Sequence, residues 1–64
     1  MTATEYQHVI EELERLVCET RHTLARFEAT GMHEKMPDDY TRLHEIYAKA
    51  ISDQRIYTLA MLNL

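Results

Sequence analysis

Cysteine, glycine and proline are nearly absent from this 64-residue chain, which contains one of each. Because Cys18 is the only cysteine, no disulfide can form within the chain. We therefore expect a reducing compartment, with Cys18 as a small apolar side chain in or beside the core. Gly31 and Pro37 enclose the one segment where a turn is expected. Strand signals are missing elsewhere, so the rest of the chain is predicted to be helical.

Long apolar runs are also missing. No segment approaches the ~20 apolar residues that a membrane-spanning helix requires. The N-terminal stretch has Glu5 early and no basic region before an apolar core, so we expect no signal peptide. The net charge of −4, from 11 acidic and 7 basic residues, disfavours nucleic acid and anionic membrane surfaces as ligands.

The first helix is predicted to cover about residues 5–30. Thr4 is its candidate N-cap, with Gln7 three residues later to complete a capping box. Gly31 suits the left-handed position that ends a helix. The apolar stripe, three positions in seven, is suited to packing against other helices. It consists of Tyr6, Leu13, Thr20 and Phe27, then Ile10, Val17 and Leu24, with Val9 and Leu16 widening it; the opposite face carries Glu5, Glu12, Glu19 and Arg26.

The second helix is predicted to cover about residues 37–63. Pro37 suits its first turn, where the missing N–H costs nothing, and Asp38 and Asp39 meet the positive end of the helix dipole. Its inward series are Leu43, Ala50, Tyr57 and Leu64, and Tyr40, Tyr47, Gln54 and Met61, with Ile46 and Ile51 beside them. The tyrosines at 40, 47 and 57 either line the space between the helices or border an interface with another protein.

Two helices of similar length with a short turn over residues 31–36 predict a single all-α domain spanning 1–64. The expected architecture is an antiparallel two-helix hairpin that resembles a short coiled coil. Two ion pairs at i,i+4 spacing are expected on its surface, Glu11–Arg15 and Glu45–Lys49. Such a hairpin has no closed core, because each helix touches only one neighbour.

Residues 56–64 carry apolar side chains on nearly every side of the second helix. The inward series accounts for some of them, but Ile56, Leu59 and Leu62 point elsewhere. Since a helix that packs on one neighbour needs only one apolar stripe, the surplus predicts a protein partner. The expected partner-binding residues are Tyr47, Ile51, Ile56, Tyr57, Leu59 and Leu62.

No pattern of reactive side chains indicates catalysis or metal binding. The histidines are never three or four residues apart, so no helix presents a pair of metal ligands. The clustered carboxylates of residues 11–14 face no matched group, and a hairpin offers no cleft for acid–base chemistry. We therefore expect no enzymatic activity, no metal and no cofactor. The four histidines are His8, His22, His33 and His44.

The turn and second helix resemble a known family. The run Met36-Pro37-Asp38-Asp39-Tyr40, followed by Leu43, Ile46, Tyr47, Ala50, Ile56, Tyr57 and Leu59, is similar to the small needle-subunit co-chaperones of type III secretion systems, the YscE/SsaE/EscE type. Pro37, Tyr40, Ala50 and Ile56-Tyr57 match the turn proline, the tyrosine that opens the second helix, the central alanine and the aliphatic–aromatic pair of that family. The chain departs from the family at Lys49, Asp53 and Gln54, where members tend to have alanine or isoleucine.

The resemblance implies a cytoplasmic helical hairpin that binds a second chaperone, a helical-repeat protein of the tetratricopeptide (TPR-like) type. Together the two chaperones would keep the needle subunit monomeric until export. Two other hypotheses stay open: a homodimeric four-helix bundle that binds nucleic acid or regulates a target, and a small inhibitor of an enzyme. Nucleic acid is the less favoured ligand, because residues 1–30 carry six acidic and three basic side chains.

We predict that the isolated chain is helical but self-associated or of low stability. The reason is uncovered apolar surface on two long helices in a chain too short to bury much of it. Circular dichroism during heating, repeated over a range of protein concentrations, checks this, because self-association makes the melting temperature rise with concentration. A monomer with a high, concentration-independent melting temperature would contradict it.

Overall fold

A computed structural model describes every residue, Met1–Leu64, and contains helices only. Its elements are α1 (Ala3–Thr30), α2 (Met32–Lys35) and α3 (Pro37–Leu62). The all-α prediction is thus confirmed. None of these helices combines the length and the apolar character needed to cross a membrane.

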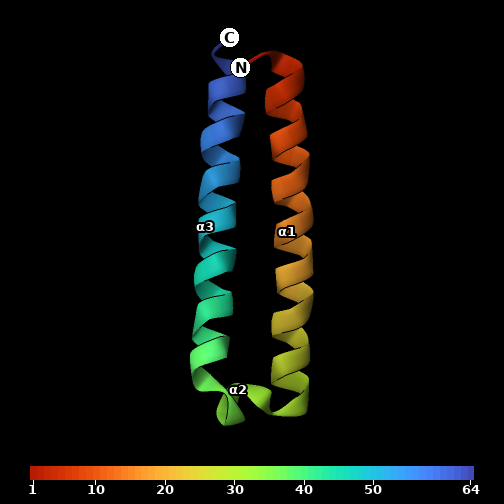
Figure 1. Ribbon diagram of the computed structural model, residues 1–64, viewed down its shortest axis with the longest axis vertical. Coiled ribbons are helices and arrows are strands. Elements are labelled where there is room, and N and C mark those ends of the chain that lie inside the picture. The colour runs from red at the N-terminus through yellow and green to blue at the C-terminus, as the bar shows by residue number, and fades with distance from the viewer.

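The helices α1 and α3 lie side by side and run in opposite directions, so both chain ends lie at one end of a rod and α2 at the other (Figure 1). The rod measures 46 × 14 × 12 Å. Aromatic rings bridge the helices at both ends. The ring centres of Tyr6 and Tyr57 are 6.2 Å apart near the chain ends, and those of Phe27 and Tyr40 are 6.3 Å apart near α2.

The first helix begins with a capping box at Thr2 and Glu5. The Glu5 backbone N–H donates to Thr2 Oγ1 at 3.1 Å, and the Thr2 N–H donates to Glu5 Oε1 at 3.0 Å. The predicted cap at Thr4 with Gln7 is therefore wrong, and α1 begins at Ala3. Both threonines fit the capping pattern, but a carboxylate also interacts favourably with the helix dipole, which the Gln7 amide cannot do as strongly.

Gly31 ends α1 in the left-handed conformation predicted for it, with φ 71° and ψ 11°. Its N–H donates to the carbonyls of Phe27 and Glu28, which would otherwise lack partners. The link that follows is a helical turn, α2, and Pro37 is the first residue of α3 as predicted.

The helix α3 ends at Leu62, close to the predicted residue 63. Leu64 consequently lies beyond the helix and is 67% exposed. Its assignment to the inward series is therefore wrong, because the seven-residue period applies only while the helix continues.

Only four residues are buried, and all lie between α1 and α3: Val17, Thr20, Leu24 and Ala50. The other members of the inward series up to Met61 are half-buried. Each helix has a single neighbour, so side chains beside the central line keep part of their surface in water. The core is a single line of contacts along the rod.

Three predictions about the surface are wrong. Cys18 is exposed, since its position on α1 points away from α3, and its thiol lies 3.6 Å from a Glu14 carboxylate oxygen. Arg15 pairs with Glu12 at 3.5 Å instead of Glu11. Lys49 pairs with Asp53 at 3.1 Å instead of Glu45. Spacings of three and four residues both bring side chains together on a helix, so spacing alone does not choose between these partners.

Replacing Gly31 with alanine should lower the free energy of unfolding by about 1 kcal/mol. The cause is conformational, because a Cβ at this position would meet no atom within 4 Å. Gly31→Asn should cost less, since asparagine tolerates the left-handed region better. Urea denaturation of the three proteins at one protein concentration measures the difference. Equal stability of Gly31→Ala and the wild type would refute this account of the turn.

Candidate protein-binding surfaces

The outer side of α3 changes character at residue 56. In a two-helix pair, heptad positions a and d face the neighbour, whereas positions b, c and f face away. The outward positions before residue 56 hold polar residues or alanine: Thr41, Arg42, Glu45, Ala48, Lys49, Ser52 and Arg55. From that point Ile56, Leu59 and Leu62 occupy them, and their side chains are 59%, 54% and 72% exposed.

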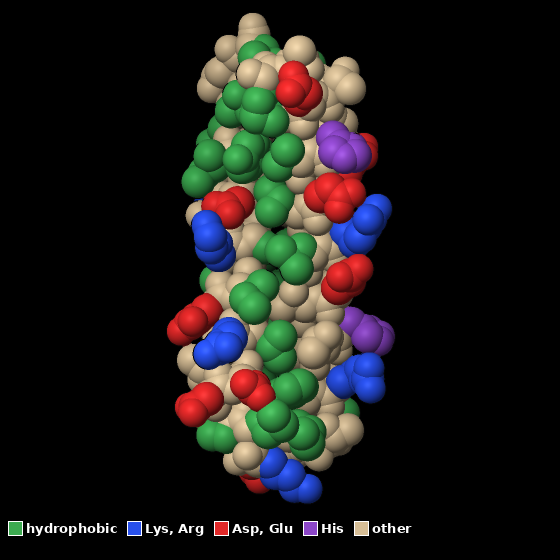
Figure 2. Space-filling view, in the orientation of Figure 1, with side chains coloured by type: hydrophobic (Ala, Val, Ile, Leu, Met, Phe, Trp, Pro, Cys, Tyr) green, Lys and Arg blue, Asp and Glu red, His purple; other side chains and the backbone are tan.

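Ile56, Leu59 and Leu62 form a row along the outer side of α3, called here the chain-end row. Their i, i+3, i+6 spacing makes successive members neighbours on the helix surface. Hydrophobic side chains gather over this half of α3 in Figure 2, at the upper left. Leu64, which was expected on the inward series, and Met1, which the sequence did not single out, add exposed apolar surface at the same end of the rod. An exposed apolar cluster of this kind is typical of an interaction site.

The other three predicted partner-binding residues lie elsewhere. The Tyr47 ring lies 5.9 Å from the Arg21 guanidinium carbon, and Tyr57 packs on Tyr6. Both tyrosines and Ile51 are half-buried beside α1. The structure therefore does not bring them together with the chain-end row. Of the two roles considered for Tyr47 and Tyr57, lining the space between the helices or bordering an interface, their positions match the first.

One edge of the line between α1 and α3 is closed by polar contacts, and we call it the polar edge. The Gln54 amide donates a hydrogen bond to the Glu14 carboxylate, and the Tyr40 hydroxyl donates to Glu28 Oε1 at 2.6 Å. The contact between Arg21 and Tyr47 lies on the same edge, since Glu14, Arg21 and Glu28 follow one another at seven-residue spacing. Side chains of both helices thus cover this edge.

The opposite edge, called the apolar edge, holds Val9, Leu16 and Thr23 of α1 and Ile46, Asp53 and Ala60 of α3. Leu16 and Ile46 each remain 39% exposed. Figure 2 shows hydrophobic side chains running along the rod between two flanks of charged residues. Unlike the polar edge, this edge has no hydrogen bond from one long helix to the other. Its apolar side chains are open to a further contact.

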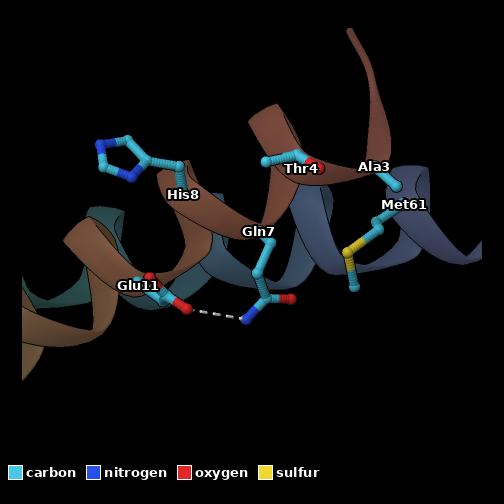
Figure 3. Close-up of a pocket in the computed structure, with 6 residues that line it drawn as sticks. All are labelled: Ala3, Thr4, Gln7, His8, Glu11 and Met61. Atoms are coloured by element: carbon cyan, nitrogen blue, oxygen red, sulfur yellow. Dashed lines mark hydrogen bonds between the residues drawn. The ribbon is translucent and has the colours of Figure 1, made fainter.

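A shallow hollow lies beside the first turns of α1. Figure 3 shows its lining residues, with Met61 approaching from α3 and the His8 ring directed away from the Gln7 amide. Gln7 Nε2 donates to Glu11 Oε1 at 3.2 Å, so these polar groups bond along one helix. No three histidine, cysteine, aspartate or glutamate side chains in the chain are grouped as metal ligands. The lining consists of Ala3, Thr4, Gln7, His8, Glu11 and Met61.

Comparisons of the chain with protein-family models, with curated proteins and with solved structures find no match. The resemblance of the turn and second helix to needle-subunit co-chaperones therefore stays a prediction. The chain-end row and the apolar edge are defined by the residues themselves and by their geometry.

Hydrogen bonds from Gln54 and Cys18 lower the pKa of Glu14. A depressed pKa means that the ionised carboxylate stabilises the folded chain above the pKa of an unfolded glutamate, ~4.3. That stabilisation is lost as the pH falls through the lower, folded-state pKa. Glu5 follows the same rule, because its bonds to the Thr2 backbone and hydroxyl lower its pKa.

The free energy of unfolding should therefore decrease when the pH is lowered through the acidic range below ~4.3. The variant Glu14→Gln should show a smaller decrease, because it has no carboxylate to protonate at the polar edge. Urea denaturation at a series of pH values measures both slopes. Glu45→Gln, on the outer side of α3, serves as the control and should follow the wild type. An unchanged slope in Glu14→Gln would refute the assignment.

Proposed function

We propose that this chain is a non-catalytic protein-binding module, an antiparallel two-helix hairpin that docks on a partner protein through its chain-end row. The observation that carries the proposal is the exposure of Ile56, Leu59 and Leu62 on the outer side of α3. Burying each side chain would stabilise a complex by roughly 1.5–3 kcal/mol before ordering costs are subtracted. No contact within the hairpin uses these surfaces, so a partner explains them best.

The shape of the chain-end row favours a groove as its receptor. Ile56 and Leu59 present two anchors one helical turn apart, and Leu62 extends them, as in an amphipathic helix laid into a hydrophobic groove. Helical-repeat proteins offer extended concave surfaces of this kind. The net charge of −4 would complement a basic rim on such a groove.

Within this class we propose a cytoplasmic co-chaperone of a type III secretion system. The support is the similarity of residues 36–60 to the needle-subunit co-chaperones, at Pro37, Tyr40, Ala50 and the Ile56-Tyr57 pair. The direct partner would be a TPR-like chaperone, and the needle subunit would be held by that chaperone. A free needle subunit exposes an amphipathic helix that polymerises, so a covered helix stays monomeric. The hairpin would stabilise the chaperone that covers it.

The double variant Ile56→Asp with Leu59→Asp should abolish copurification with a coexpressed TPR-like chaperone. Two carboxylates would be desolvated in the groove, whereas the free hairpin keeps them in water. The helical content, measured by circular dichroism, should stay unchanged.

Two controls accompany this test. Met36→Asp places the same charge on an apolar residue that is 40% exposed at the other end of the rod, and Glu12→Ala changes the charged face of α1. Both should bind as the wild type does. If the double variant copurifies at wild-type yield, the chain-end row is not the binding surface.

A further inference from the structure

The apolar edge is a second surface, which the proposed function does not use. Its residues form three layers along the rod, because α1 and α3 run in opposite directions. Counted from the contact of Glu14 with Gln54, the layers are Val9 with Ala60, Leu16 with Asp53, and Thr23 with Ile46, each pair level to within one residue. Leu16 and Ile46 lie well inside their helices, away from the helix ends, and still keep 39% of their surface exposed.

We infer that a second copy of this chain covers the apolar edge and forms a four-helix bundle with a two-fold axis parallel to the rods. In this arrangement α1 of one copy packs against α3 of the other. Each α1 residue of a layer therefore also faces the α3 residue of the same layer in the other copy. Asp53 is the one charged side chain in these layers. Its carboxylate is already paired with Lys49, 3.1 Å away at the flank of the edge.

The charges beside the apolar edge favour a second copy as its occupant. Glu14 contacts Gln54 across the helices, so Glu19, five residues later on α1, is level with Lys49, five residues earlier on α3. The two-fold axis therefore places Glu19 of each copy beside Lys49 of the other. Opposite charges meet twice in one dimer, so this pair of positions is self-complementary.

The same register also predicts one unfavourable pair of positions, which likewise meets twice in the dimer. Arg21 lies beside Tyr47, so Arg26 is level with Arg42 and the two-fold axis brings these like charges together. Glutamate at position 42 should therefore strengthen the dimer, whereas reversing the charge of Glu19 should weaken it. These two opposite effects are specific to this arrangement of the two copies.

The size of the face is sufficient for a dimer. A rod side of 46 × 14 Å offers about 640 Å² per copy, which gives about 1,300 Å² in total and reaches the range of ~1,200–2,000 Å² for specific interfaces. The single chain fully buries only four residues. A second pair of helices would enclose the half-buried side chains next to this line, which is how small helical domains commonly gain stability.

Sedimentation equilibrium over a range of protein concentrations tests the inference. We expect a wild-type dimer, and a monomer when Leu16→Glu is combined with Ile46→Glu. The double variant Leu59→Asp with Leu62→Asp, which removes the two members of the chain-end row that do not share the row of Arg42 and Lys49, should lose partner binding and remain dimeric. Failure of partner binding in that variant is thus distinguishable from failure of self-association.

Charge variants at exposed positions test the geometry without disturbing the fold. Glu19→Lys alone and Lys49→Glu alone should each raise the dimer dissociation constant by about tenfold, since each exposed pair occurs twice. The two changes together should restore it only in part, because Lys49→Glu also removes the ion-pair partner of Asp53. Arg42→Glu should lower the dissociation constant. A wild-type chain that stays monomeric up to millimolar concentration would overturn the inference, as would a dimer that is insensitive to Leu16→Glu with Ile46→Glu.

Discussion

One line of contacts between two helices holds this chain together. Apart from the short helix α2 at one end, each long helix touches only the other, so a residue is either on that line or exposed to water on at least one side. Val17, Thr20, Leu24 and Ala50 are the residues that reach full burial. The partial exposure of the large aliphatic side chains follows from this constraint.

The two edges of that line use different chemistry. At the polar edge, Glu14, Arg21 and Glu28 reach across to amide and phenol groups of α3 and close the gap. At the apolar edge, Leu16 and Ile46 make no such bonds, and their surface stays available. The chain-end row is a third type of surface, because it faces away from α1 altogether. A chain of 64 residues thus has a closed edge, an open edge and an apolar outer side.

Much of the fold could be predicted from the sequence, because a period near 3.6 residues, one glycine and one proline leave few alternatives. Gly31 and Pro37 stand where they were expected, since each has a backbone preference that few other residues share. The N-cap was misplaced because Thr2 and Thr4 begin equivalent patterns. The partner of Lys49 was also wrong, since Glu45 and Asp53 are equally spaced from it.

The candidate surfaces were only partly predictable. The outward position of Ile56, Leu59 and Leu62 follows from helical spacing within α3 alone. Spacing placed Tyr47 on the inward series, but it did not decide between a helix contact and an interface with a partner, because tyrosine suits both equally well. The difference between the two edges depends on which residues of α1 and α3 lie level with each other. Spacing within one helix does not contain that information.

The two ends of the rod are restrained differently. At the end with α2 the helices are covalently joined, and the Tyr40 ring lies 4.7 Å from that of His44 and 5.6 Å from that of His33. At the other end no connection joins the two helices (Figure 1), and the Tyr6–Tyr57 ring contact holds them together. The chain-end row lies on this less restrained segment, and such segments open at a lower free-energy cost than the core. Docking there would also order the last turns of α3, so the affinity for a partner would depend on how well those turns are formed before the encounter.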